Sequence, residues 1–332
     1  MTSTDELRAM VSGVRVSAAL CVAAELGLSD LLVTGPRTVA DLAAASRSDE
    51  RTLRRLLRAL ATVGVYVERP DGMFAGTELS DGLRSDVPGS VRAMARTTAD
   101  PAVWAAWGHL LHSVRTGRNA FEELHGVDVW THRRENPQWN AIFNENMTVL
   151  SSLVADRVAS AYDFSGCTSV VDVGGGQGVM LEAVLTRHPH LTGTVFDRAH
   201  VVASAPSQPA PAVAGRWSLV SGSFFDAVPP ADAYLLKSVL HDWPDDACVA
   251  ILRTCAEGLS EDGVVLVVER VLGRTGREVE GAFSDLNMLV LPGGQERTES
   301  EYAALFAAAG LTLVQVIDTG SAFPILEARR AG

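Results

Sequence analysis

The feature that most constrains the fold of this chain is a glycine-rich run near its middle. Residues 170–178 read VVDVGGGQG, an apolar stretch that leads into glycines and then into a segment with helical spacing from Val179. Glycine lets the backbone approach a ligand closely, and a helix N-terminus presents free N–H groups and a partial positive charge. This order of strand, turn and helix predicts a site for a nucleotide-like cofactor.

The spacing of these glycines separates the site from two better-known phosphate-binding loops. A dinucleotide fingerprint requires GxGxxG, but after Gly174 and Gly176 the third glycine is Gly178, and Val179 occupies the required position. No GK[ST] follows the run, which excludes a P-loop. The site is therefore expected to take a different nucleotide-like molecule.

The second half of the chain alternates apolar runs with helix-like segments. Continuous apolar strands joined by helices predict a parallel, doubly wound sheet that is buried on both faces, with ligands outside the carboxyl ends of its strands. The expected strands are 169–173, 194–196, 218–220, 233–236, 264–269, 311–317 and 325–328.

The first half of the chain reads as helical. Thr38 and Asp49 are expected helix N-caps, and the second of these helices should end at Gly64 before a small hairpin with an Asp71-Gly72 turn. Two helices followed by a hairpin are typical of a winged-helix pattern. Further helices are expected over 104–114 and 136–162, so we predict one domain over residues 1–160 and a second over 161–332.

Composition narrows the classes of function. The 332 residues carry a net charge of −12, which repels phosphate backbones and anionic membrane surfaces. The four cysteines lack a CxxC spacing, as expected in a reducing compartment. No stretch approaches the roughly 18 apolar residues of a spanning helix. We therefore expect a cytoplasmic protein that binds neither nucleic acid nor membrane.

Polar residues follow the expected strands where a cofactor would lie. Asp197 ends the second strand, a place where a carboxylate can accept hydrogen bonds from ribose hydroxyls. The third strand leads into GSFFD (222–226), and the fourth into LLKSVLHDW (235–243). Lys237 in this last run is the only lysine among 28 basic residues.

Taken in order, these motifs resemble the plant-type and antibiotic-pathway small-molecule O-methyltransferases, whose caffeic acid and flavonoid enzymes are typical members. The resemblance also includes VVLVVERV, DLNMLVLPGGQERTESEY and the terminal ILEARR, and it covers nearly the whole chain. It implies an α/β, Rossmann-like class I methyltransferase domain after a winged-helix-type dimerisation domain. It also implies S-adenosylmethionine as cofactor, no metal, and a homodimer in which the N-terminal helices help to close the partner's acceptor site.

The resemblance also implies roles for individual residues. His241 matches the catalytic base, and Glu269 and Glu296 match the two carboxylates that flank it. The expected cofactor-binding residues are Asp172, Gly174, Gly176, Asp197, Gly222, Ser223, Phe224, Lys237, Ser238 and Trp243. The expected acceptor-binding residues are Trp139, Phe143, Met147, Asp242, Asn287, Met288 and Leu291. The loop before Pro292 is one residue shorter than in the plant enzymes, and Leu291 replaces a polar residue, so acceptor identity does not carry over.

Several of these residues also have a purely structural interpretation. Trp139, Phe143 and Met147 recur at helical spacing, which by itself predicts core packing. The pairs His109/His112 and His188/His190 lack the further ligands of a tetrahedral metal site. Four arginines of a helix resemble a recognition helix, although an acidic chain makes a solvated face the better interpretation: Arg51, Arg54, Arg55 and Arg58.

The chemistry of methyl transfer explains why a base is expected. The methyl donor is already electrophilic, so the enzyme must align an oxygen and remove its proton. Proton transfer from a phenol of pKa about 10 to a histidine of pKa about 6.5 is uphill by roughly 5 kcal/mol, which a carboxylate at the other ring nitrogen would offset. Three alternatives remain open: methylation of an amine or carbon, a repurposed hydroxylation or decarboxylation, and a winged-helix regulator that senses S-adenosylmethionine.

Overall fold

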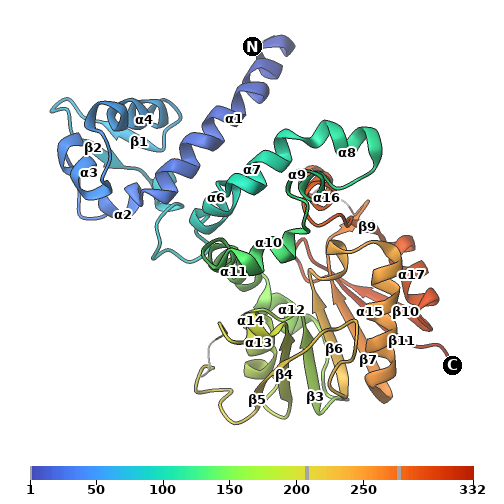
Figure 1. Cartoon of the computed structure of the whole chain (residues 1–332). Coiled ribbons are helices and arrows are strands. Elements are labelled where there is room, and N and C mark those ends of the chain that lie inside the picture. Colours follow the sequence, from blue (N-terminus) through green and yellow to red (C-terminus); the bar gives the residue numbers. More distant parts are fainter. Residues whose placement is uncertain (1, 206–208, 275–277) are drawn as a thin grey trace. The chain divides into compact units, whose positions relative to one another are not determined.

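The computed structural model describes residues 2–205, 209–274 and 278–332. The chain forms two compact units, one of residues 1–104 and 138–149, the other of residues 105–137 and 150–332 (Figure 1). We predicted a single boundary near residue 160, whereas these units divide the chain after residues 104, 137 and 149. The difference arises because helices of the 105–137 segment and α12 pack with the sheet-containing unit, as in the contact of α12 with α13.

The first unit is mainly helical and carries the expected winged-helix pattern. Thr38 and Asp49 cap their helices, accepting hydrogen bonds from the backbone N–H groups of Asp41 and Thr52. The antiparallel pair β1–β2 follows, with Tyr66 opposite Gly76. Its elements are α1 (Ser3–Glu25), α2 (Leu28–Leu31), α3 (Val39–Ser46), α4 (Glu50–Thr62), β1 (Tyr66–Glu68), β2 (Phe74–Gly76), α5 (Glu78–Asp81), α6 (Arg92–Thr98), the first half of α7 (Pro101–Gly108) and most of α11 (Pro137–Ser152).

Helix α1 differs from our expectation about membranes. By length and composition alone its 23 residues could cross a membrane, although we expected no segment apolar enough to do so. Its apolar side chains are largely exposed in the single chain, including Met10 at 75% and Val11 at 78%. Because a lone helix rarely leaves such a face in water, a partner surface is expected to cover it.

The second unit contains the predicted sheet. Its helices are α8 (Leu110–Thr116), α9 (Ala120–His125), α10 (Val129–Glu135), α12 (Ala155–Ala161), α13 (Val179–Arg187), α14 (Ala199–Val202), the 3-10 turn η1 (Leu240–Asp242), α15 (Asp245–Gly258), α16 (Glu278–Val290) and α17 (Glu299–Ala308). Its strands are β3 (Ser169–Val173), β4 (Thr192–Asp197), β5 (Trp217–Ser221), β6 (Ala231–Lys237), β7 (Leu259–Val268), β8 (Val271–Leu272), β9 (Arg297–Thr298), β10 (Leu311–Ile317) and β11 (Ile325–Arg330).

The main sheet has the strand order β10-β11-β7-β6-β3-β4-β5. Strands β5, β4, β3, β6 and β7 run parallel, while β11 is antiparallel to both β7 and β10. The carboxyl ends of β6, β3, β4 and β5 therefore lie next to one another, which is where the polar motifs of the sequence fall. All seven strands that we predicted are present.

Side chains of successive residues in the central strands pack on opposite faces of this sheet. Val171 and Leu236 face α15 and α17, whereas Val170 and Leu235 face α12 and α13. This alternation, buried on both sides, is the pattern that continuous apolar strands predict. The two expected long helices are each divided, at His109 between α7 and α8 and at residues 153–154 between α11 and α12.

Candidate active site

The glycine-rich turn after β3 has the backbone shape that only glycine adopts readily. Gly174, Gly176 and Gly178 have φ of 69°, 58° and 78°. A Cβ at Gly174 would lie 2.9 Å from Cγ2 of Val239, and one at Gly178 would lie 2.1 Å from the Trp217 ring. The turn is therefore held close to its neighbours and leads directly into the N-terminus of α13.

Two buried carboxylates border this turn. Asp197, at the end of β4, accepts hydrogen bonds from the N–H groups of Gly176 at 2.9 Å and Arg198 at 2.6 Å. Burial raises the pKa of Asp197. Burial, and then the nearby charge of Asp197, raises the pKa of Asp172 to about 7. Within the described residues, Oδ2 of Asp172 is buried without a hydrogen-bond partner, an arrangement that favours a bound cationic or hydrogen-bonding group.

Aromatic side chains follow β5 on the other side of the turn. Ser223 accepts a hydrogen bond from the N–H of Phe225 at 3.2 Å. The Phe224 and Phe225 rings meet Trp243 edge-on, with centroid distances of 5.9 and 4.9 Å. Gly222 lies against the Phe196 ring, because a Cβ added at Gly222 would be 2.5 Å from that ring. The structure therefore brings the expected Gly222, Ser223, Phe224 and Trp243 into one region.

Lys237 and Ser238 lie at the end of β6. The Lys237 ammonium lies 5.1 Å from the centroid of the Phe323 ring, and Arg270 approaches the same ring at 4.7 Å. Burial lowers the pKa of Lys237, while the charge of Glu269 opposes this shift. Ser238 has a left-handed φ of 54°, uncommon for a residue with a side chain, and this turns the chain into η1.

His241 lies on η1 among three carboxylates. Its Nδ1 is 3.1 Å from Oε1 of Glu296 and 3.4 Å from Oε2 of Glu269. Its Nε2 is 3.7 Å from Oδ1 of Asp242. The structure thus brings together the three residues that we expected to act in catalysis, although they are separated by as many as 55 positions in the sequence.

These neighbours change the basicity of the ring. Burial favours neutral His241, but the charges of Glu269, Asp242 and Glu296 outweigh burial and raise the pKa of His241 to about 10. Burial raises the pKa of Glu269 to about 7, with the charge of His241 opposing the shift. The pKa of Glu296 is lowered despite burial, because His241 and Ser284 hydrogen bond to it.

Glu269 also holds the main chain of the turn. Its Oε1 accepts hydrogen bonds from the N–H groups of Val239 at 2.8 Å and Leu240 at 2.9 Å, with that of His241 at 3.4 Å. Glu296 in turn accepts a hydrogen bond from Ser284 at 2.6 Å. Glu296 is therefore the closer carboxylate to the imidazole, whereas Glu269 contacts both the ring and the backbone that carries it.

The expected acceptor-binding residues fall in both units. Asn287 and Met288 lie on α16, and Leu291 follows it. Oδ1 of Asn287 accepts a hydrogen bond from Nε1 of Trp107 at 3.1 Å. The other expected residues, Trp139, Phe143 and Met147, are partly buried on α11 in the first unit. Their role at the acceptor therefore stays a prediction.

Sequence reasoning missed three residues of this region. Ser284 donates to Glu296, Trp107 donates to Asn287, and Arg297 is fully buried beside the turn. Arg297 directly follows the expected Glu296 in the sequence, but no periodic pattern marks Arg297 as buried. Trp107 and Asn287 are 180 positions apart, so only the folded chain reveals their contact.

One group of side chains has the residue types of a metal site. Ligand atoms of His241, Glu269 and Glu296 lie within 4.8 Å of one another, which makes this the one such group found among residues 2–205, 209–274 and 278–332. The pairs His109/His112 and His188/His190 are not part of such a group. Since the same atoms surround the expected base, the absence of a metal requirement stays a prediction.

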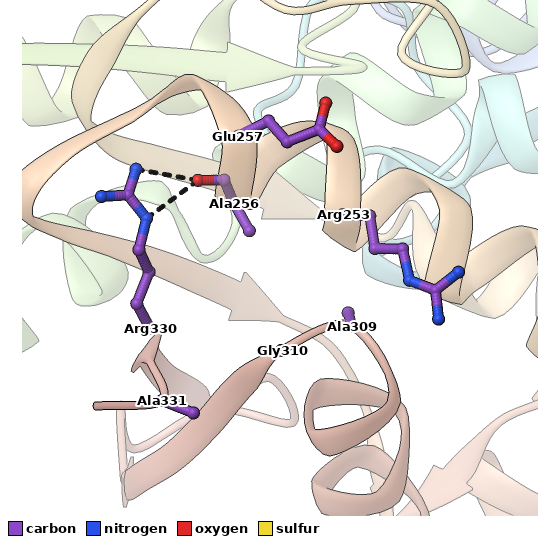
Figure 2. Close-up of a pocket in the computed structure, with 7 residues that line it drawn as sticks. All are labelled: Arg253, Ala256, Glu257, Ala309, Gly310, Arg330 and Ala331. Atoms are coloured by element: carbon purple, nitrogen blue, oxygen red, sulfur yellow. Dashed lines mark hydrogen bonds between the residues drawn. The ribbon is translucent and has the colours of Figure 1, made fainter.

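A separate surface cavity of about 390 Å³ lies at the C-terminal ends of α15 and α17 (Figure 2). Arg330 donates to the carbonyl of Ala256 at 3.1 and 2.9 Å. Arg253 donates to the carbonyl of Ala308 at 2.8 Å. These arginines satisfy free carbonyls at helix C-termini, a structural role that accounts for their positions.

Comparison with known proteins identifies the family. A model of the O-methyltransferase domain matches residues 107–312, and one of the O-methyltransferase dimerisation domain matches residues 9–86. The chain belongs to this family of O-methyltransferases. It is an S-adenosylmethionine-dependent O-methyltransferase, as its sequence motifs predicted. The α/β methyltransferase fold with an N-terminal dimerisation domain is also confirmed.

Individual relatives align over nearly the whole O-methyltransferase. The mitomycin biosynthesis 6-O-methyltransferase of Streptomyces lavendulae is 42% identical over 97% of this chain and 93% of its own. The crystal structure of LaPhzM has a TM-score of 0.95 at 38% identity, with all of both chains covered. NcsB1 from neocarzinostatin biosynthesis, solved with S-adenosylhomocysteine and 1,4-dihydroxy-2-naphthoic acid, has a TM-score of 0.80 at 36% identity over 95% of this chain and 96% of its own.

Proposed function

We propose that this O-methyltransferase methylates a phenolic hydroxyl of a small aromatic secondary metabolite, with His241 as the general base. The observation that carries the proposal is the placement of Glu296 and Glu269 at 3.1 and 3.4 Å from Nδ1 of His241. These contacts leave Nε2 as the nitrogen that can receive a proton from the acceptor. NcsB1, bound to a naphthoic acid, supports an aromatic acceptor.

The basicity of His241 supports a phenol in particular. Its pKa of about 10 is close to the reference value for a phenol, so proton transfer to the neutral ring, which is uphill by roughly 5 kcal/mol for an unperturbed histidine, becomes nearly isoenergetic. An alkyl alcohol is far less acidic and would remain a poor proton donor to this base. The carboxylates thus make the neutral ring basic enough to take a phenol's proton, and the ring must first lose its own proton, so activity should rise with pH.

The residues at the carboxyl ends of β3, β4, β5 and β6 fit S-adenosylmethionine. When bound, this cofactor supplies an electrophilic methyl group on a sulfonium. Asp197 would hold the ribose hydroxyls through its remaining acceptor capacity, and Oδ2 of Asp172, which is buried without a hydrogen-bond partner, would face polar groups of the methionine portion. Ser223 and Phe224 would border the adenine, while Gly174 and Gly176 allow close approach of the main chain.

The oligomeric state and the cellular compartment are inferred from the N-terminal domain and the cysteines. We infer a homodimer through the N-terminal domain, because residues 9–86 match a dimerisation domain and α1 exposes Met10 and Val11. This surface also offers an explanation of the apolar α1 that does not require a membrane. The four cysteines are free, as expected in the reducing cytoplasm, and we propose that the enzyme acts there without a metal or nucleic-acid partner.

The proposal is tested by methyl transfer from labelled S-adenosylmethionine to a panel of acceptors. The panel contains hydroxynaphthoic acids, hydroxyquinones, matched anilines and alkyl alcohols, each assayed with and without EDTA. We expect transfer to phenolic oxygen that EDTA leaves unchanged. Preference for anilines, oxidation or decarboxylation of the acceptor, or loss of activity in EDTA would each overturn the corresponding part of the proposal.

The regulator alternative has a test of its own. Arg58 forms an ion pair with Glu68 at 2.8 Å and Arg54 pairs with Glu50 at 3.4 Å, which reduces the positive charge that helix α4 presents. We therefore expect no salt-sensitive binding to duplex DNA in a gel-shift assay, with or without the cofactor. A stable shift at physiological salt would favour the regulator.

A further inference from the structure

The turn that carries His241 is held from two sides. On its amide side, Oε1 of Glu269 accepts hydrogen bonds from the N–H groups of Val239 and Leu240 at 2.8 and 2.9 Å. On its carbonyl side, the guanidinium of Arg297 donates to the carbonyl of Leu240 at 3.1 Å and to that of Trp243 at 2.8 Å. The main-chain groups on both flanks of His241 are therefore fixed by buried charged side chains.

The donors of Arg297 are all engaged. Nε and Nη2 donate to Oδ1 of Asp245 at 3.0 and 2.7 Å, and Nη1 donates to the carbonyl of Gln295 at 3.3 Å. With the two carbonyls of the turn, these bonds account for the five N–H groups of a guanidinium. The side chain of Arg297 is fully buried, whereas that of Asp245 is 65% exposed. Two of the five hydrogen bonds of this buried guanidinium thus go to the carbonyls of the turn.

The surroundings leave the turn little freedom to move. Ser238, which precedes it, has a left-handed φ of 54°. The main chain of Gly294 lies directly against it, since a Cβ at Gly294 would be 2.1 Å from the carbonyl oxygen of His241. Such an unusual backbone persists only where neighbouring groups determine it. On its carbonyl side the Cys248 thiol, a weak donor, contacts the carbonyls of Leu240 and Trp243 at 3.1 and 3.4 Å, and Arg297 supplies the charged hydrogen bonds to the same two groups.

We propose that Arg297 is a positioning residue for methyl transfer, which sets the location of His241 by holding the carbonyl groups of Leu240 and Trp243. The role rests on the proposed function, because a precise location matters only if His241 takes the proton of the acceptor. Two neighbouring residues then have different roles, because Glu296 orients the imidazole and Arg297 fixes the main chain that carries it. A base displaced by about 1 Å can lose ~10²-fold in rate.

The test compares Arg297→Lys with Asp245→Asn. Lysine keeps the charge but offers a single nitrogen in place of the planar fork, so it cannot reproduce the separate contacts of Nη1 and Nη2 with the two carbonyls. Asparagine at 245 keeps an oxygen that can accept from Arg297 and leaves both carbonyl contacts in place, which makes it the matched control. Arg297→Gln replaces the lysine variant if that variant does not fold, and hydrogen exchange of all variants is measured with saturating S-adenosylhomocysteine to support the folded state.

The first readout, hydrogen exchange followed by mass spectrometry, needs no acceptor. In Arg297→Lys we expect exchange of the 238–245 peptide to rise by about tenfold or more, with the 311–330 hairpin unchanged and cofactor affinity within about twofold. Asp245→Asn should leave the 238–245 peptide close to wild type. Unchanged exchange at 238–245, or an equal rise in the hairpin, would show that Arg297 does not hold the turn specifically.

The second readout is the pH profile of methyl transfer to 1,4-dihydroxy-2-naphthoic acid, with His241→Ala in parallel. We expect Arg297→Lys to lose ~10²-fold in kcat near neutral pH and to recover as the acceptor ionises, because a phenolate needs no base. A folding defect would instead lower the rate equally at every pH. If His241→Ala loses activity while Arg297→Lys keeps it, the positioning role is wrong; if His241→Ala keeps full activity, the base itself is wrong.

Discussion

The charge of Glu296 should control the pH at which the enzyme becomes active, and Glu296→Gln isolates that charge. The glutamine oxygen can still accept from Nδ1 of His241 and from Ser284, which lie 3.1 and 2.6 Å from Oε1 in the native enzyme. The orientation of the ring is thus retained while one of three neighbouring carboxylate charges is removed. The variant therefore separates electrostatics from geometry.

The direction of the effect follows from the pKa of His241. The pKa is raised to about 10, so the ring binds a proton at neutral pH and activity should rise with pH as the neutral base forms. The sulfonium of the bound cofactor lowers this pKa by like-charge repulsion. We therefore expect kcat of the wild-type enzyme saturated with cofactor to rise with pH along an acid limb. The apparent pKa of this limb should lie between the reference value of about 6.5 for histidine and 10.

Glu296→Gln should move this limb by about one to two units toward lower pH, the effect of removing one adjacent opposite charge. The base also becomes weaker, so the rate on the plateau should fall by at most about tenfold for each unit of pKa lost. The two effects oppose each other near neutral pH, where the profiles of variant and wild type should approach or cross. Above the acid limb the variant should be slower.

The assay measures kcat from pH 5.5 to 10 for two phenols of different acidity, with the exposed Glu257→Gln as a control for loss of one charge. A limb that belongs to the enzyme stays in place when the phenol changes. A uniform decrease of the Glu296→Gln rate at every pH, or a limb that moves to higher pH, would refute the reasoning.

Three further predictions concern the cofactor site, the fold and the dimer. Asp197→Ala should weaken S-adenosylmethionine binding by roughly 1.5 to 3 kcal/mol through loss of charged hydrogen bonds, and unchanged affinity in calorimetry would remove Asp197 from the site. Gly178→Ala should lower the free energy of unfolding by about 1 to 3 kcal/mol more than Gly126→Ala, because both have positive φ but only the former places a Cβ 2.1 Å from Trp217; equal losses in chemical denaturation would contradict this. Val11→Asp should convert a dimer to a monomer in light scattering, since this side chain is 78% exposed in the single chain, and an unaffected dimer would place the interface elsewhere.

Much of the fold was predictable because its signals are local. Apolar runs predicted every strand of the main sheet, and Thr38 and Asp49 marked helix starts through their own side-chain oxygens. The breaks at His109 and at residues 153–154 were missed, since helical spacing continues through them. Nor does periodicity reveal that β11 is antiparallel to both its neighbours, because direction depends on how the connection crosses the sheet.

The candidate site was predictable by family resemblance more than by physics. The resemblance placed Glu269 and Glu296 beside His241, and the structure brings them within 3.4 Å of its Nδ1. It did not reveal that Glu269 accepts from the backbone of the turn, or that Arg297 reaches Leu240 across 57 positions. Such contacts depend on how distant segments pack, which no local pattern specifies.

The measurement that tests the account most directly is the pH dependence of methyl transfer by His241→Ala. We expect cofactor affinity to stay nearly intact while turnover near neutral pH falls by about 10²- to 10⁴-fold, the usual effect of removing a general base. The remaining rate should climb with pH toward the pKa of the phenol, because a phenolate formed in solution needs no base. A variant that transfers methyl at the wild-type rate near neutral pH would contradict the role of His241 and the mechanism built on it.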